Sequence, residues 1–79
     1  MKKSVMQNIK LNVDYVIVGF NEYINLKLKR RLLELGFVIN SKIKVINKSF
    51  LKKVYLIELN NCLISLRTNI VNQIKLLEA

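Results

Sequence analysis

An alternating segment interrupted by two asparagines is the feature that most restricts how this chain can fold. Residues 54–67 read VYLIELNNCLISLR, with Asn60 and Asn61 at the centre. Asparagine tolerates the positive φ angles that two-residue hairpin turns require, so we predict an antiparallel hairpin that turns at these two residues. A shift of one residue would mix the two faces, so the register is well determined. Apolar pairs share one face: Leu59 with Cys62, Ile57 with Ile64, and Tyr55 with Leu66. Mixed pairs share the other: Glu58 with Leu63, Leu56 with Ser65, and Val54 with Arg67.

Three further segments have the composition of strands. Residues 13–20 are apolar on both faces, which is typical of a strand covered on both sides. Residues 42–48 alternate, and residues 73–77 form a last short strand after Thr68, which we expect to cap a turn over 69–72. Four or five short strands with one helix predict a small antiparallel barrel. The expected inward residues are Ile43, Val45, Ile74 and Leu76, and the expected outward residues are Lys42, Lys44 and Lys48.

One short helix is predicted over residues 26–35, with Asn25 as its N-cap. At about 100° per residue, three leucines share one stripe and are expected to face the core. Gly36 follows at a position that commonly needs a left-handed backbone, and Asn40 is expected to take a similar conformation at the entry to the next strand. The three leucines of the stripe are Leu28, Leu32 and Leu35.

The opposite side of this helix also carries leucines. Leu26 and Leu33 lie there, flanked by Lys29 and Arg30. In one interpretation a neighbouring loop, residues 20–24, covers the two leucines. In the other they form an exposed contact surface for another protein.

The composition excludes several kinds of chemistry. The 79 residues predict a single domain over 1–79, and Cys62 is the only cysteine in a chain without histidine. A disulfide or a Cys/His zinc site is therefore excluded, and Cys62 is expected to be a small core residue. We expect no metal or cofactor site, because the five acids show no clustered spacing. Two glycines cannot build a P-loop, and no serine or cysteine has a histidine base, so we expect no enzyme activity.

The net charge of +9 has two interpretations. Lysine, asparagine and isoleucine number 11, 10 and 10 residues, a bias typical of AT-rich codons. Yet nine of the fourteen cations fall between Lys27 and Lys53, where Glu34 is the only acid. A cluster of this kind is also found in proteins that bind nucleic acids.

No segment has the pattern of a membrane span or of a secretory signal. Residues 1–10 carry two lysines without a following apolar run, and the apolar run at 15–20 is far shorter than the roughly 20 residues a spanning helix needs. We therefore expect a cytoplasmic protein without membrane insertion.

The stretch from Arg31 to Val45 resembles the signature of the FeoA family, small SH3-like barrel proteins of bacterial ferrous iron transport. The matching run is Arg31, Leu32, Leu33, Glu34, Leu35, Gly36 and Phe37, followed by a strand with Ile43 and Val45. VIVGF at 16–20 is similar to the family's first strand, and LISLR at 63–67 to its ending. The resemblance covers roughly residues 6–77. Ile39-Asn40 stands where the family has Pro-Gly, and Asn12 where it has glycine.

The resemblance implies an SH3-like barrel of about five strands, with the helix between the first two. It also implies a cytosolic accessory protein of ferrous iron uptake, with family-level association to transition metals. The implied partner is FeoB, a permease with a cytosolic GTP-hydrolysing part, which would bring the protein to the inner face of the membrane. Leu26, Lys29, Arg30 and Leu33 are the candidate partner-binding residues. The sequence does not decide whether the effect is on GTP hydrolysis, assembly or gating.

Two alternatives stay open beside this interpretation. A small basic barrel could bind nucleic acid, but the six aromatic residues are dispersed rather than interleaved with the cations, so we expect no specific nucleic-acid binding. The chain also resembles the terminal barrel of iron-dependent repressors, without their DNA-reading helix pair. Weak self-association is left open.

Overall fold

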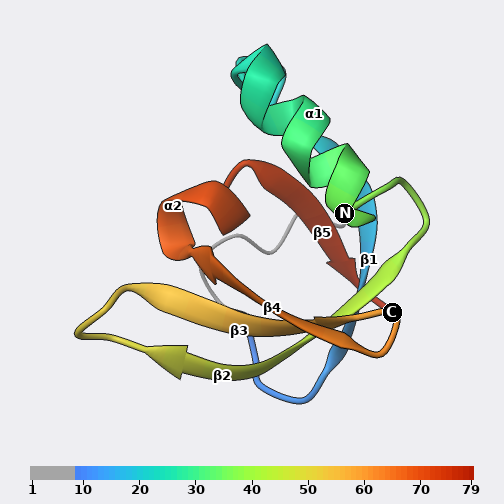
Figure 1. Ribbon diagram of the computed structural model, residues 1–79. Helices are drawn as coiled ribbons and strands as arrows, with labels where there is room; N and C mark the ends of the chain where they lie inside the picture. Colours follow the sequence, from blue (N-terminus) through green and yellow to red (C-terminus); the bar gives the residue numbers. More distant parts are fainter. Residues whose placement is uncertain (1–8) are drawn as a thin grey trace.

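A computed structural model describes residues 9–79, which form a five-stranded antiparallel sheet and two helices (Figure 1). Residues 1–8, which include most of the segment judged unlike a secretory signal, lie outside the described residues. The strand order is β4-β3-β2-β1-β5. The elements are β1 (Asp14–Phe20), α1 (Leu26–Leu35), β2 (Lys42–Ser49), β3 (Val54–Leu59), β4 (Cys62–Arg67), α2 (Thr68–Val71) and β5 (Ile74–Glu78).

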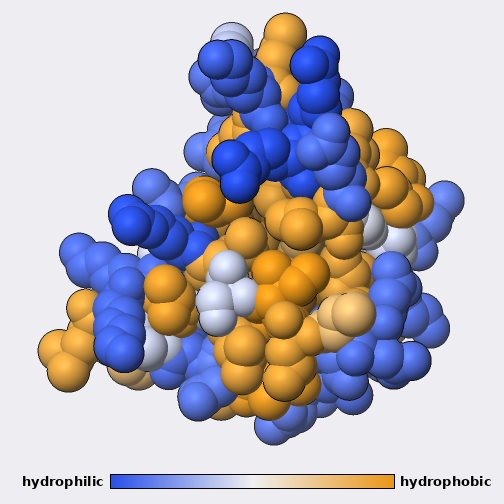
Figure 2. All heavy atoms as spheres, viewed as in Figure 1, coloured by the Kyte–Doolittle hydropathy of each residue, from blue (hydrophilic) through white to orange (hydrophobic). Residues whose placement is uncertain are grey.

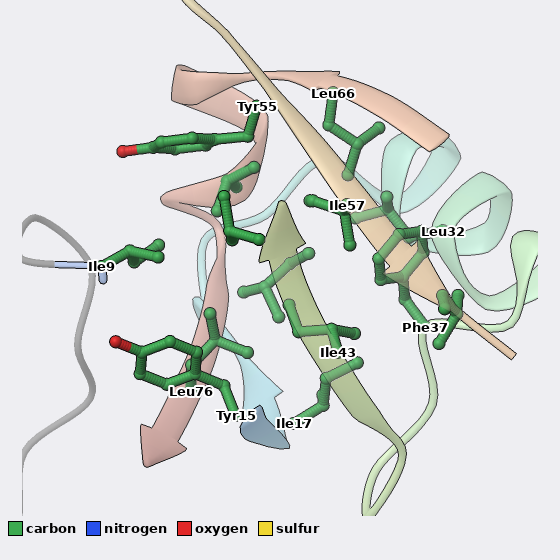
Figure 3. Close-up of a cluster of buried hydrophobic side chains, with 14 residues drawn as sticks. Ile9, Tyr15, Ile17, Leu32, Phe37, Ile43, Tyr55, Ile57, Leu66 and Leu76 are labelled. Carbon is green, nitrogen blue, oxygen red and sulfur yellow. The ribbon is translucent and has the colours of Figure 1, made fainter. Parts of the chain in front are cut away.

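This architecture confirms the predicted mainly-β fold with one short helix between the first two strands. The sheet bends so that β5 and β1 lie across the core from β3 and β4 (Figure 1). Apolar side chains from all five strands meet inside it (Figure 3). Among the described residues no buried side chain is polar or charged. The buried residues are Ile9, Tyr15, Ile17, Leu32, Phe37, Ile43, Val45, Tyr55, Ile57, Leu59, Leu66, Val71, Ile74 and Leu76.

The β3–β4 hairpin has the predicted register at every pair. Asn60 and Asn61 have φ angles of 53° and 66°, as the turn requires. The prediction for Cys62 was wrong, because this residue is exposed. It is the first residue of β4, which is an edge strand of the sheet, whereas Leu59 opposite is covered by the chain near Gly36.

A bulge in β2 changes which side chains face inward. Ile43 and Val45 are buried as predicted, but the pairing with β3 shifts by one residue after Val45. Lys48, predicted to point outward, therefore pairs with the buried Tyr55 and lies on the inner side of the strand. Its Nζ donates a hydrogen bond to the Ile9 carbonyl at 3.4 Å.

The first strand is covered on one face only. Tyr15 and Ile17 are buried, but Val18 on the other face is exposed, so the predicted cover on both sides was wrong. The reason is that the helix packs at one end of the sheet instead of over the outer face of β1. The last strand agrees with its prediction, because Ile74 and Leu76 are both buried.

Side chains and backbone groups close both ends of α1 as predicted. Asn25 Oδ1 accepts hydrogen bonds from the N–H groups of Lys27 and Leu28, at 2.8 and 3.2 Å. At the other end Gly36 has a φ of 108°, and its N–H donates to the Leu33 carbonyl. The N–H of the next residue, Phe37, donates to the Leu32 carbonyl at 2.9 Å, which completes a Schellman motif.

This motif decides which residues of α1 reach the core. Leu32 is buried and packs beside the buried Phe37 (Figure 3), and Leu28 is half-buried. Leu35 was predicted to face the core, but half of its surface is exposed. The chain reverses at Gly36 and brings Phe37 into the place that Leu35 would have filled.

The second helix, α2, is a single turn. Thr68 was predicted to cap it, but Thr68 is the first helical residue, and the N-cap is Arg67, which makes no side-chain capping hydrogen bond. The Thr68 N–H instead donates to the Lys53 carbonyl at 2.9 Å, which ties the turn to the loop between β2 and β3. Within residues 9–79, neither helix is long and apolar enough to cross a bilayer.

Candidate functional site

The outer face of α1 is the surface that the sequence marked as a candidate contact site. Leu26 is 75% exposed and Leu33 is 40% exposed, and Arg30 between them is also exposed. The interpretation in which residues 20–24 cover these leucines was therefore wrong, because this segment packs Ile24 toward the core instead. The helix extends away from the barrel, with its first turn farthest out (Figure 1).

Lys29 differs from the other three predicted residues. Its side chain is half-buried, and its Nζ lies 5.7 Å from the centroid of the Phe20 ring. This cation–π contact directs the ammonium group toward the end of β1. Lys29 therefore helps to hold α1 against the barrel, while Leu26, Arg30 and Leu33 remain free on the surface. We call these three residues the α1 outer face.

A second exposed apolar group lies where α1 ends and the chain turns toward β2. Sequence reasoning missed it, because Leu35 was assigned to the core and the two residues after Phe37 carry no periodic pattern. The signal that could have found it is the Schellman motif, which buries the residue after the glycine and leaves its neighbours outside. The group consists of Leu35, Val38 and Ile39.

Two acidic side chains, one on β1 and one on β3, line the same hollow at one end of the sheet. Asp14 and Glu58 lie on either side of Lys44 in the sheet register and line a hollow of about 260 Å³. Lys44 Nζ lies 3.8 Å from Asp14 Oδ1, so a cation already neutralises this end of the sheet. Over the described part of the chain, no three cysteine, histidine or acidic side chains come together as metal ligands would.

Among the described residues, these observations make the exposed surfaces the candidates for a functional site. The α1 outer face offers apolar side chains and a guanidinium on a helix that has few neighbours. Such a face can bind a complementary protein surface, since apolar contact supplies affinity and the cation supplies orientation.

Comparison with known proteins places this fold in a family. The FeoA domain matches residues 5–76. No curated protein sequence matches the chain at a significant level. The solved FeoA protein from Chlorobium tepidum is 23% identical, with a TM-score of 0.80, over 99% of this chain and 70% of that one.

Two other solved structures share the fold over a smaller part of their own length. Iron(II) transport protein A from Clostridium thermocellum is 18% identical, with a TM-score of 0.83, over 96% of this chain and 45% of that one. The manganese-activated repressor ScaR is 20% identical, with a TM-score of 0.81, over 96% of this chain and 35% of that one. At these identities the structures show the fold alone. The domain match covers almost the whole sequence and confirms the resemblance read from residues 31–45, and the chain belongs to the FeoA domain family.

Proposed function

We propose that this protein is an accessory protein of ferrous iron uptake that acts by contact with the cytosolic part of a FeoB-type GTP-binding permease. The α1 outer face is the contact surface in this proposal. The single observation that carries it is the exposure of Leu26 and Leu33 on a helix that projects from the barrel. Membership of the FeoA family and the iron(II) transport name of one structural relative support the choice of partner.

Contact of an exposed leucine side chain with water is unfavourable, and the fold does not require leucine at these positions. Leu26 begins the helix and its side chain contributes little to the barrel core, because three quarters of its surface meets water. A polar residue there would preserve the helix, since capping by Asn25 does not involve the side chain of Leu26. Apolar side chains grouped on an exposed face are typical of protein contact sites.

The test measures binding of the purified protein to the cytosolic part of the permease from the same organism, by calorimetry. Leu33→Asp is expected to weaken binding about tenfold or more, because it places a carboxylate in an apolar contact. Arg30→Glu is expected to act in the same direction, and more strongly at low salt, because exposed charges are screened by ions. Unchanged affinity for both variants would show that the outer face is not the contact.

Two controls separate a lost contact from a lost fold. Leu63→Asp places the same charge on an exposed leucine of β4, and it should leave binding unchanged. Thermal unfolding of Leu33→Asp should stay close to that of the parent protein. If Leu33→Asp unfolds the domain as readily as Leu32→Ala does, the leucine belongs to the core and the proposed surface is wrong.

The nucleic-acid alternative finds no specific support in the structure. Tyr23 and Phe50 are strongly exposed, but they come from two different loops and form no shared stacking platform. A repressor role has no support either, because the described residues contain only α1 and the single turn of α2 as helices.

A further inference from the structure

The tip of the β2–β3 hairpin exposes two large apolar side chains. Phe50 is 82% exposed and Leu51 is 97% exposed, and the value for Leu51 is the highest among the large apolar residues that the structure describes. The hairpin reaches out from the barrel, and Figure 2 shows apolar atoms at its far end with hydrophilic atoms beside them. We call residues 48–53 the hairpin tip.

The geometry of the turn does not explain these two residues. Ser49 Oγ accepts a hydrogen bond from the N–H of Lys52 at 3.2 Å, and Lys53 takes the left-handed conformation with a φ of 55°. These two features close the loop, and the two positions between them could be polar residues or glycine, as in most turns. The chain instead places a phenylalanine and a leucine at the positions farthest from the core.

Cations surround the apolar tip. Lys48 Nζ lies 5.7 Å from the centroid of the Phe50 ring, so an ammonium group accompanies the aromatic side chain. Lys52, Lys53 and Arg67 line a hollow of about 540 Å³ beside the tip, and none of the residues that line it is acidic. Thr68 and Asn69 complete this hollow with a hydroxyl and an amide. These groups are donors that suit the oxygens of a phosphate.

The acids of the sheet lie at its other end. Asp14 and Glu58 flank Lys44, whereas the hairpin tip follows Ser49. Ser49 lies five positions after Lys44 along the strand, which is roughly 16 Å. The hairpin therefore has one end where acids and lysines neutralise one another and one end that is cationic and apolar.

We propose that the hairpin tip binds the surface of an anionic phospholipid bilayer. Phe50 and Leu51 enter the boundary between headgroups and acyl chains, and Lys52, Lys53 and Arg67 contact headgroup phosphates. A convex tip suits a deformable lipid surface, since a protein partner would have to supply a matching pocket for both side chains. Shallow insertion differs from a membrane span, which neither the sequence nor the helices support.

This proposal revises the expectation that no part of the chain enters a bilayer. It does not depend on the proposed contact with a permease, because the lipid surface and the α1 outer face are different parts of the molecule. A vesicle contains no permease, so failure of one proposal leaves the other standing.

The first experiment is co-sedimentation of the full chain with vesicles of phosphatidylcholine and phosphatidylglycerol. We expect binding to these vesicles and little binding to phosphatidylcholine alone. Phe50→Ser with Leu51→Ser should weaken binding about tenfold or more, because the inserted apolar area is lost. Lys52→Glu with Lys53→Glu should have a similar effect, because each cation near an anionic surface contributes several-fold to the affinity.

Matched controls change the same chemistry elsewhere. Lys42→Glu with Lys75→Glu alters the net charge equally on exposed residues outside the hairpin tip, and Leu26→Ser removes an exposed leucine from α1. Both should bind vesicles within about threefold of the parent protein, since neither touches the tip. All variants change exposed side chains, so their unfolding temperatures should stay near that of the parent.

A second experiment reports insertion directly. The chain has no tryptophan, so Phe50→Trp introduces a single tryptophan at the tip, whose emission can be followed apart from that of the three tyrosines. Its emission should shift to the blue with anionic vesicles and be quenched by lipids brominated on the acyl chain. Leu63→Trp on β4 should show neither effect.

Three results would overturn the proposal. One is absence of sedimentation with anionic vesicles at low salt. Another is binding that the two lysine substitutions abolish and the Phe50 and Leu51 substitutions leave unchanged, which would indicate a surface for soluble polyanions such as nucleic acid. The third is equal loss of binding in the Lys42 and Lys75 control, which would indicate attraction by net charge alone.

Discussion

Most of the described residues with a left-handed backbone conformation are asparagines. The structure describes five residues other than glycine with positive φ, and four of them are asparagines; the fifth is Lys53. Asparagine tolerates this region because its short side chain can hydrogen-bond to the local backbone. Gly36 has a φ of 108°, outside the range that the asparagines occupy, which extends from 53° to 77°. The backbone at the end of α1 therefore requires glycine at position 36.

Replacement of Gly36 tests this requirement. Gly36→Ala should lower the free energy of unfolding by about 1–2 kcal/mol, because a Cβ disfavours the left-handed conformation. The new Cβ would also lie 3.4 Å from Leu59 Cδ2. Urea unfolding provides the measurement.

The other glycine provides the matched control. A Cβ at Gly19 would meet only Lys75 Cδ, at 3.9 Å, and its backbone is not left-handed. Gly19→Ala should therefore change the free energy of unfolding by less than about 0.5 kcal/mol. Equal losses for the two variants would contradict the conformational explanation.

At the scale of elements, only a few side-chain contacts hold α1 against the barrel. Leu32 is its one fully buried side chain, and Phe37 packs against it from the residue after the cap. The contact of Lys29 with Phe20 and the half-burial of Leu28 complete the attachment. The remaining faces of the helix are available for a partner, which is the physical basis of the proposed contact surface.

Truncation of leucines along α1 should separate the buried face from the exposed ones. Leu32→Ala should cost about 2–5 kcal/mol of unfolding free energy, as for buried leucines in general. In a domain of this size that loss approaches the total stability. Leu35→Ala, at a half-exposed position, should cost less than about 1 kcal/mol. Similar losses at the two positions, measured by thermal unfolding, would contradict the assignment of Leu32 as the anchor.

At the scale of the whole molecule, the acids of the sheet lie at one end, away from the end that is both cationic and apolar. The described acids include Asp14 and Glu58, which face lysines at one end of the sheet, and cations dominate the other end. Soft or nitrogen ligands for iron are scarce, because the chain has no histidine and one exposed cysteine. In the described part of the chain no three cysteine, histidine or acidic side chains come together as a ligand set for iron.

Iron binding can be measured on the intact protein. Anaerobic titration of iron(II) should give no saturable heat or absorbance change below about millimolar, because no carboxylate, thiolate and imidazole set is available. Asp14→Asn with Glu58→Gln should leave the titration unchanged. A tight site of one iron per chain would contradict this prediction, and its loss in the double variant would locate the site beside Lys44.

Much of this fold follows from short-range patterns. The hairpin at Asn60-Asn61, the cap at Asn25 and the stop at Gly36 could all be predicted, because each depends on residues within a few positions along the chain. Alternation identified the inward side chains of β5 and of β2 as far as Val45, since a strand side chain has only two directions. The α1 outer face could be proposed for the same reason, from helical spacing.

The tertiary structure decided the features that depend on what packs against each element. Leu35 and Cys62 are exposed because Phe37 takes the inner place at the end of α1, and because β4 lies at the edge of the sheet. Lys48 turned inward because a bulge after Val45 changed the alternation. The exposed hairpin tip at Phe50 and Leu51 also became visible only in three dimensions. Local chemistry determines where an element begins and ends, whereas burial depends on distant neighbours that no local pattern specifies.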